Sequence, residues 1–124
     1  ININDYLNAE KNYDGYIMTM KSSESKWSYI NYDNNKSIIG IVEKKVVSSD
    51  ATVGIYNFSK GKLFVDYSEE MIEKNDRVNN EFYVAPVYTY IAKKKFKLGI
   101  YDISGKMYGL GTPEDLNIFL KKFI

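Results

Sequence analysis

ATVGIYNFSKGKLFVDYSEEMIEKN, residues 51–75, contains a strand pattern that passes directly into a helix pattern. Its first part is rich in the β-branched and aromatic residues that favour strands. Its second part repeats apolar residues at helical spacing. The predicted inward face is Phe64, Tyr67, Met71 and Ile72, and the outward face is Glu69, Glu70, Glu73 and Lys74. A strand followed by an amphipathic helix indicates a sheet covered by helices.

The rest of the chain continues this alternation. Further strands are predicted at 16–21, 27–33, 37–45 and 96–104, with the Asn-rich stretch 34–36 joining two of them in a hairpin. A short first helix is expected to begin at Asn4 as its N-cap, and another helix contains Pro86 in its first turn. The apolar face of that second helix is Val87, Tyr88 and Ile91. We therefore expect one α/β domain over residues 1–124, a small mixed sheet covered by helices.

GLGTPEDL, residues 109–116, predicts the start of a closing helix. Thr112 is a suitable N-cap, Pro113 suits the first helical position, and Asp115 places a carboxylate near the positive end of the helix dipole. The apolar face is Leu116, Phe119, Leu120 and Phe123. We expect this face to close the domain, with Gly109 and Gly111 bringing the backbone to the rim of a site.

Composition limits the possible chemistry. The chain of 124 residues is 44% hydrophobic, which is typical of a folded globular domain. A net charge of +1 provides no strong basic field for nucleic acid. Without Cys or His, thiol nucleophiles and the commonest general base are excluded. Chemistry must rely on carboxylates, Lys, Tyr, Ser or Thr, or on an oxygen-ligated metal such as Mg²⁺.

The sequence has neither a signal-peptide pattern nor an apolar run near the roughly 20 residues that span a bilayer. We expect a cytoplasmic protein with no membrane partner. The chain begins at Ile1 rather than Met, close to the predicted first helix. A start so close to a cap favours the interpretation that an upstream portion belongs to the native protein.

Adjacent acidic and basic residues at a strand end are the first candidates for function. Glu43 and Lys44 lie at the end of the strand pattern of residues 37–45, just before a turn. They are either solvated strand-end charges or a pair that holds a polyhydroxylated anion, the carboxylate accepting from hydroxyls and the ammonium meeting a phosphate. Gly54 interrupts a strand pattern, which indicates a bulge or a place where a ligand approaches the backbone.

Other candidates have equally open alternatives. Glu81 and Tyr83 lie where a loop meets a helix, so Glu81 is either a helix N-terminal charge or a site residue. Trp27, beside Ser28, is either a core anchor or a stacking platform. The basic run 93–97 is interpreted as a solvated connection between a helix and a strand.

The order of these motifs carries more information than any one of them. KWSYINYD, VEKK, ATVGIYNF, the long helix, NNEFYVAPVY and YGLGTPEDL follow one another along the chain. In this order they resemble the C-terminal half of bacterial sugar-phosphate nucleotidyltransferases, which have a Rossmann-like fold. That resemblance implies transfer of a nucleotidyl group from an NTP to a sugar 1-phosphate, giving an NDP-sugar and pyrophosphate for surface polysaccharide synthesis.

The resemblance implies a substrate-binding set of Trp27, Ser28, Glu43, Lys44, Gly54, Glu81, Tyr83 and Gly109. Within it, Glu43 would hold sugar hydroxyls and Lys44, the catalytic residue, would hold the sugar phosphate. Many relatives have glycine in place of Ser28 and a magnesium-ligating aspartate in place of Gly109. We therefore assign no metal ligand in this chain. Mg²⁺ and the NTP would be bound in the intact enzyme through an N-terminal half, and the 124 residues alone are expected to be inactive.

Two alternatives remain open from the sequence. One is a sugar-phosphate-binding module without catalysis. The other is an oligomerisation module that uses exposed tyrosines. A sheet with an exposed edge or apolar face is prone to self-association, so a homo-oligomer is expected in each case.

Overall fold

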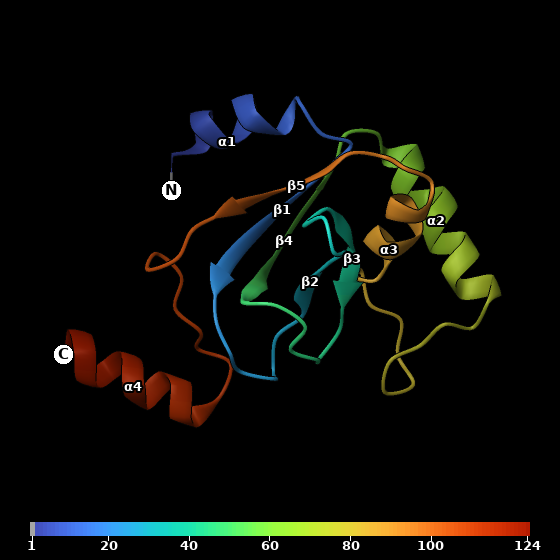
Figure 1. Ribbon diagram of the computed structural model, residues 1–124. Helices are drawn as coiled ribbons and strands as arrows, with labels where there is room; N and C mark the ends of the chain where they lie inside the picture. Colours follow the sequence, from blue (N-terminus) through green and yellow to red (C-terminus); the bar gives the residue numbers. More distant parts are fainter. Residues whose placement is uncertain (1) are drawn as a thin grey trace.

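The computed structural model describes residues 2–124, which form one five-stranded sheet with four helices (Figure 1). The strands are β1 (Gly15–Lys21), β2 (Tyr29–Tyr32), β3 (Ile38–Val42), β4 (Asp50–Phe58) and β5 (Leu98–Asp102). The helices are α1 (Ile3–Glu10), α2 (Gly61–Glu73), α3 (Val87–Lys93) and α4 (Pro113–Phe123). The strand order is β3-β2-β4-β1-β5, with β5 parallel to β1 and the other pairs antiparallel. This confirms the predicted α/β class and the small mixed sheet.

Strand β1 is covered on both of its faces. Its side chains alternate, so Ile17 packs in the cluster that contains Tyr88 of α3. Tyr16 and Met18 point the other way and pack with Tyr6 of α1. Helices α2 and α3 therefore lie on one side of the sheet and α1 on the other (Figure 1).

Tyr88 is the central contact between α3 and the sheet. Its side chain is fully buried, and its hydroxyl donates a hydrogen bond to the Asn57 carbonyl oxygen at 2.8 Å. Its ring stacks on Phe58 of β4, with 4.6 Å between the ring centroids. A Cβ atom on Gly15 would lie 2.7 Å from the Tyr88 ring, so only glycine fits at the start of β1.

The β2–β3 hairpin is joined to the rest of the sheet by a short contact. Tyr29 of β2 pairs with Ala51 of β4, and the Thr52 N–H donates to the Ser28 carbonyl at 2.8 Å. Helix α3 adds Thr89, whose hydroxyl accepts from the Ile41 N–H at 3.2 Å and donates to the Ile41 carbonyl at 3.3 Å. The hairpin is therefore held by α3 as well as by β4.

Two local predictions are wrong. The N-cap of α1 is Asn2, whose side chain accepts from the backbone N–H groups of Asn4 and Asp5, so Asn4 lies inside the helix. Ile72 is 53% exposed although periodicity placed it on the inward face of α2. Met71 is buried as predicted, and Ile72 is not, because α3 covers a narrower stripe of α2 than the pattern indicated.

Helix α4 begins as predicted but does not close the domain. The Thr112 hydroxyl accepts from the Asp115 N–H at 3.1 Å, and Pro113 occupies the first turn. No side chain of α4 is buried, and the helix lies apart from the sheet (Figure 1). Leu116, Leu120 and Phe123 are 43%, 38% and 51% exposed.

None of the helices within residues 2–124 combines the length and the apolar character that a membrane-spanning helix requires.

Gly40 provides a test of how α3 holds the hairpin. Its φ is +146°, and a Cβ atom there would lie 2.9 Å from the Thr89 Cα and closer still to its side chain. We expect Gly40→Ala to lower the free energy of unfolding by about 2 kcal/mol or more, because α3 must shift away from β3.

Gly111→Ala is the control for this prediction, since no atom lies within 4 Å of its Cβ position. Its free energy of unfolding should change by less than about 0.5 kcal/mol. Urea denaturation of the two variants measures both values. Equal stability of the two would contradict the packing described.

Candidate functional site

Glu43 is held in place at the end of β3. Strand β3 ends at Val42, and Glu43 begins the turn that follows. Its side chain is only 7% exposed, and the Ser28 hydroxyl donates a hydrogen bond to its carboxylate. Burial of a carboxylate is costly unless hydrogen bonds compensate. Glu43 is thus a fixed acceptor rather than a solvated strand-end charge.

Lys44 lies next to this carboxylate, but its side chain is partly exposed to solvent. Its ammonium lies 3.8 Å from the Glu43 carboxylate and donates to the Lys26 carbonyl oxygen at 3.0 Å, while its side chain remains 45% exposed. Its backbone is left-handed, with φ of 59°. The pair thus offers one fixed carboxylate and one accessible ammonium, as the binding of a hydroxylated anion requires.

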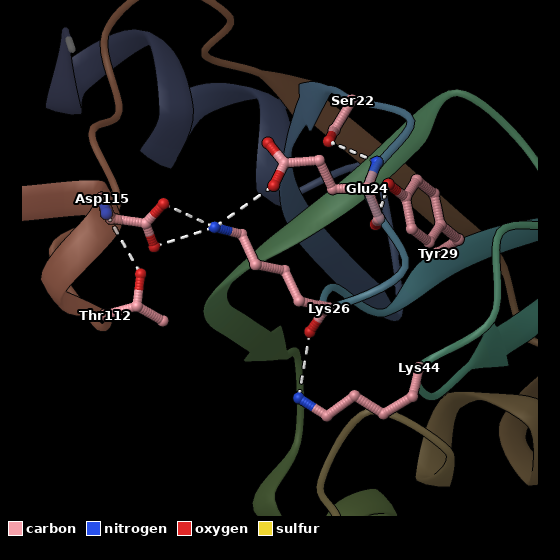
Figure 2. Close-up of polar contacts among 7 residues, drawn as sticks. All are labelled: Ser22, Glu24, Lys26, Tyr29, Lys44, Thr112 and Asp115. Carbon is pink, nitrogen blue, oxygen red and sulfur yellow. Dashed lines mark hydrogen bonds and ion pairs between the residues drawn. The ribbon is translucent and has the colours of Figure 1, made fainter. Parts of the chain in front are cut away.

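Lys26 lies at the centre of a polar network between the β1–β2 loop and α4 (Figure 2). Its ammonium is 2.7 and 2.8 Å from the two carboxylate oxygens of Asp115 and 3.3 Å from the Glu24 carboxylate. The hydrogen bond to Asp115 raises the pKa of Lys26. In return, hydrogen bonds from Lys26 and then Thr112 lower the pKa of Asp115. The network therefore joins two segments of chain that are 89 residues apart in the sequence.

Trp27 and Gly109 meet at the same place. A Cβ atom on Gly109 would lie 3.4 Å from two ring carbons of the half-buried Trp27. A cavity of about 280 Å³ opens beside them between the loop and α4. Its lining includes Lys21, Lys26, Trp27, Tyr108, Asp115 and Lys122. Trp27 is a wall of this cavity rather than an anchor of the core.

Tyr83 lines a separate hollow with Phe64, Met71 and Val87. A hydrogen bond with Glu81 raises the pKa of the Tyr83 hydroxyl, and the negative charge of Glu43 adds to the effect. Glu81 itself is exposed and pairs through its backbone with Val78. Since α3 begins at Val87, Glu81 lies before its first turn and is not a helix N-terminal charge.

Gly54 occupies a bulge in β4, as one of the two interpretations predicted. Ile17 pairs with Tyr56 and Thr19 with Thr52, so three residues of β4 lie opposite Met18. The φ of Gly54 is +86°, and no atom lies within 4 Å of its Cβ position. Its backbone is therefore open to approach, but the structure packs no other candidate side chain against it.

The surroundings of Gly109 offer few oxygen ligands for a metal ion. Within residues 2–124, no group of three or more acidic side chains gathers at one point. Gly109 supplies no side-chain ligand, and both oxygens of Asp115 are engaged by the Lys26 ammonium. An ammonium bound at a carboxylate opposes the binding of a cation there.

Solved structures with the same fold identify the architecture. A nucleoside-diphosphate-sugar pyrophosphorylase from Vibrio cholerae superposes with a TM-score of 0.80 at 21% identity, over 92% of this chain and 49% of its own. The chain shares the fold of about half of this protein. A Bacillus anthracis protein described as a glucose-1-phosphate thymidylyltransferase superposes with a TM-score of 0.69 at 23% identity. The match covers 100% of this chain and 50% of that protein. An inositol-1-phosphate CTP transferase from T. maritima superposes with a TM-score of 0.59 at 14% identity. The match covers 89% of this chain and 44% of that protein.

The chain spans about half the length of these nucleotidyltransferase-fold structures. No model of a protein family matches the sequence, and no curated protein matches it. The fold resemblance stated from the motifs is thus confirmed by structures, whereas the roles of individual residues stay predictions.

Sequence reasoning missed Lys26 and Glu24 and gave Asp115 only a role in helix capping. The available signal was weak, because a lysine beside a tryptophan and an aspartate after a proline each have ordinary local explanations. Only the fold shows that their side chains meet.

Ser28→Ala tests whether Glu43 is held by its neighbour. Loss of the hydroxyl removes a charge-assisted hydrogen bond to a carboxylate that is only 7% exposed. We expect the free energy of unfolding to fall by about 1–3 kcal/mol. Ser25→Ala, at an exposed position in the same loop, is the control and should change it by less than about 0.5 kcal/mol. Similar values for both variants in urea denaturation would contradict the role of Ser28.

Proposed function

We propose that this chain is the sugar-phosphate-binding half of a sugar 1-phosphate nucleotidyltransferase. The supporting observation is the pair of Glu43, a held carboxylate, and Lys44, an accessible ammonium, at the end of one strand. Sugar hydroxyls would donate to Glu43, and the sugar phosphate would meet Lys44 as a point charge. Trp27 lines the cavity next to α4 and Tyr83 lines a separate hollow, so neither is needed for this pair to hold the ligand. The likeness to the fold of sugar-nucleotide enzymes supports this choice among hydroxylated anions.

The proposed reaction is an in-line displacement at phosphorus. An oxygen of the sugar phosphate attacks the α-phosphorus of the NTP and forms a new P–O bond. The bond from the α-phosphorus to the bridging oxygen breaks, and pyrophosphate leaves with the electron pair. The role of Lys44 is to orient the attacking phosphate and to offset its charge, so that two anions can approach.

Other parts of the proposal lie outside this chain. The NTP would be bound by a second half of a longer protein, and magnesium would be held there as well. The NDP-sugar would serve surface polysaccharide synthesis in the cytoplasm. These elements rest on the resemblance of the motifs.

Lys44→Ala tests the proposed site directly. We expect at least one sugar 1-phosphate in a panel to bind the 124-residue chain in ligand-observed NMR. Affinity should fall by about tenfold or more in Lys44→Ala, because a charge-assisted contact is lost.

Lys95→Ala is a matched control, since Lys95 is an exposed lysine with the same left-handed backbone, φ of 63°. It should bind the sugar phosphate like the native chain. Equal weakening by both variants would indicate general charge attraction and would contradict the assignment of Lys44.

Self-association is a second proposed property, favoured by α4. Ile118 and Phe123 are 60% and 51% exposed on a helix without a buried side chain. Exposed apolar faces of this kind mark association surfaces. We expect sedimentation velocity to show an oligomer that Ile118→Glu dissociates. Asn117→Glu, which adds the same charge at a polar exposed position, should leave it intact. A monomer at all concentrations would contradict this proposal.

A further inference from the structure

We infer that Lys26 is a positioning residue for Lys44, and that its contact with Asp115 couples the placement of α4 to the phosphate-binding ammonium. This inference rests on the proposed function of Lys44. Neither Lys26 nor Asp115 touches the proposed sugar phosphate in this account. They act by fixing the acceptor that holds the Lys44 side chain.

The first observation is that Lys26 contacts Lys44 through its backbone carbonyl and Asp115 through its side-chain ammonium (Figure 2). Its backbone carbonyl accepts from the Lys44 ammonium at 3.0 Å. Its own ammonium is bound by both oxygens of Asp115 at 2.7 and 2.8 Å. Because one residue carries both contacts, a shift of the loop backbone on loss of the Asp115 contact would also move the carbonyl that holds Lys44.

The second observation concerns the loop that carries Lys26. Residues 22–28 join β1 to β2, and outside contacts hold the loop near its ends: the Ser22 N–H donates to the Ser49 carbonyl at 3.1 Å, and the Thr52 N–H donates to the Ser28 carbonyl at 2.8 Å. The Tyr29 hydroxyl also donates to the Glu24 carbonyl at 2.6 Å. Lys26 lies in the part of the loop between these anchors, and its ammonium contacts Asp115 of α4.

The third observation concerns α4. None of the side chains of α4 is buried. Its Phe119 and Phe123 pack against Tyr108, which lies in the segment just before the helix. Asp115 is fixed in the first turn because Thr112 accepts from its N–H, and its side chain is 17% exposed. The ion pair of Lys26 and Asp115 therefore connects α4 to the loop of residues 22–28.

A purely structural role of this ion pair predicts something different. A partly exposed pair contributes little to global stability. Its removal should therefore leave the fold intact, and the effect should appear at Lys44. Lys26→Met is informative because it removes the ammonium but retains the backbone carbonyl that accepts from Lys44.

The first test needs no ligand. In the native 124-residue chain with ¹³Cε-labelled lysine, Lys44→Arg assigns the Lys44 resonance. Asp115→Asn and Lys26→Met should each shift the Lys44 resonance toward that of the exposed Lys95, because the ammonium loses its fixed acceptor. Lys26→Arg retains the ion pair and should leave the resonance unchanged. Asp66→Asn removes the remote 2.8 Å ion pair with Lys62 on α2 and is the matched control.

The second test adds glucose 1-phosphate as the probe. Asp115→Asn and Lys26→Met should each weaken its binding by about threefold or more, which is within the range of coupling between neighbouring residues. Lys26→Arg and Asp66→Asn should leave its binding unchanged. An unshifted Lys44 resonance in both disruptive variants would overturn the inference. A shifted resonance in a chain that binds no sugar phosphate would support the coupling and contradict the proposed function.

Discussion

The packing of α3 against the sheet is the constraint on which the site depends. Tyr88 fixes α3 to β4 through a buried hydrogen bond and a stacked ring, and Thr89 fixes the same helix to Ile41 of β3. The hairpin contacts β4 over a short length. Since Glu43 and Lys44 follow β3 directly, α3 determines where this acid and base lie relative to β4.

Within that frame, the site combines held and accessible groups. Ser28 holds the Glu43 carboxylate, so an acceptor is already oriented before any ligand arrives. The Lys44 ammonium is held by the Lys26 carbonyl at 3.0 Å and lies 3.8 Å from the Glu43 carboxylate, while its side chain is 45% exposed, so an anion can reach it where it is held. Pre-orientation of this kind reduces the entropy lost on binding.

Local patterns predicted the secondary structure well because strands, helices and caps depend on neighbouring residues. The cap of α4 at Thr112 and the bulge at Gly54 are examples. Periodicity identifies which residues share a face but not what covers that face, which is why Ile72 and the apolar face of α4 were predicted to be buried. The contact of Lys26 with Asp115 spans 89 residues, so no local pattern could predict it.

The most direct test of the central claim is the location of bound sugar phosphate on the ¹H–¹⁵N spectrum of the chain. We expect glucose 1-phosphate, or another sugar 1-phosphate that binds, to perturb the amides of Ser28, Glu43 and Lys44 most strongly. Perturbation concentrated instead at the lysine-rich connection of residues 93–97 would show that the anion binds elsewhere, and it would contradict the assignment of the site.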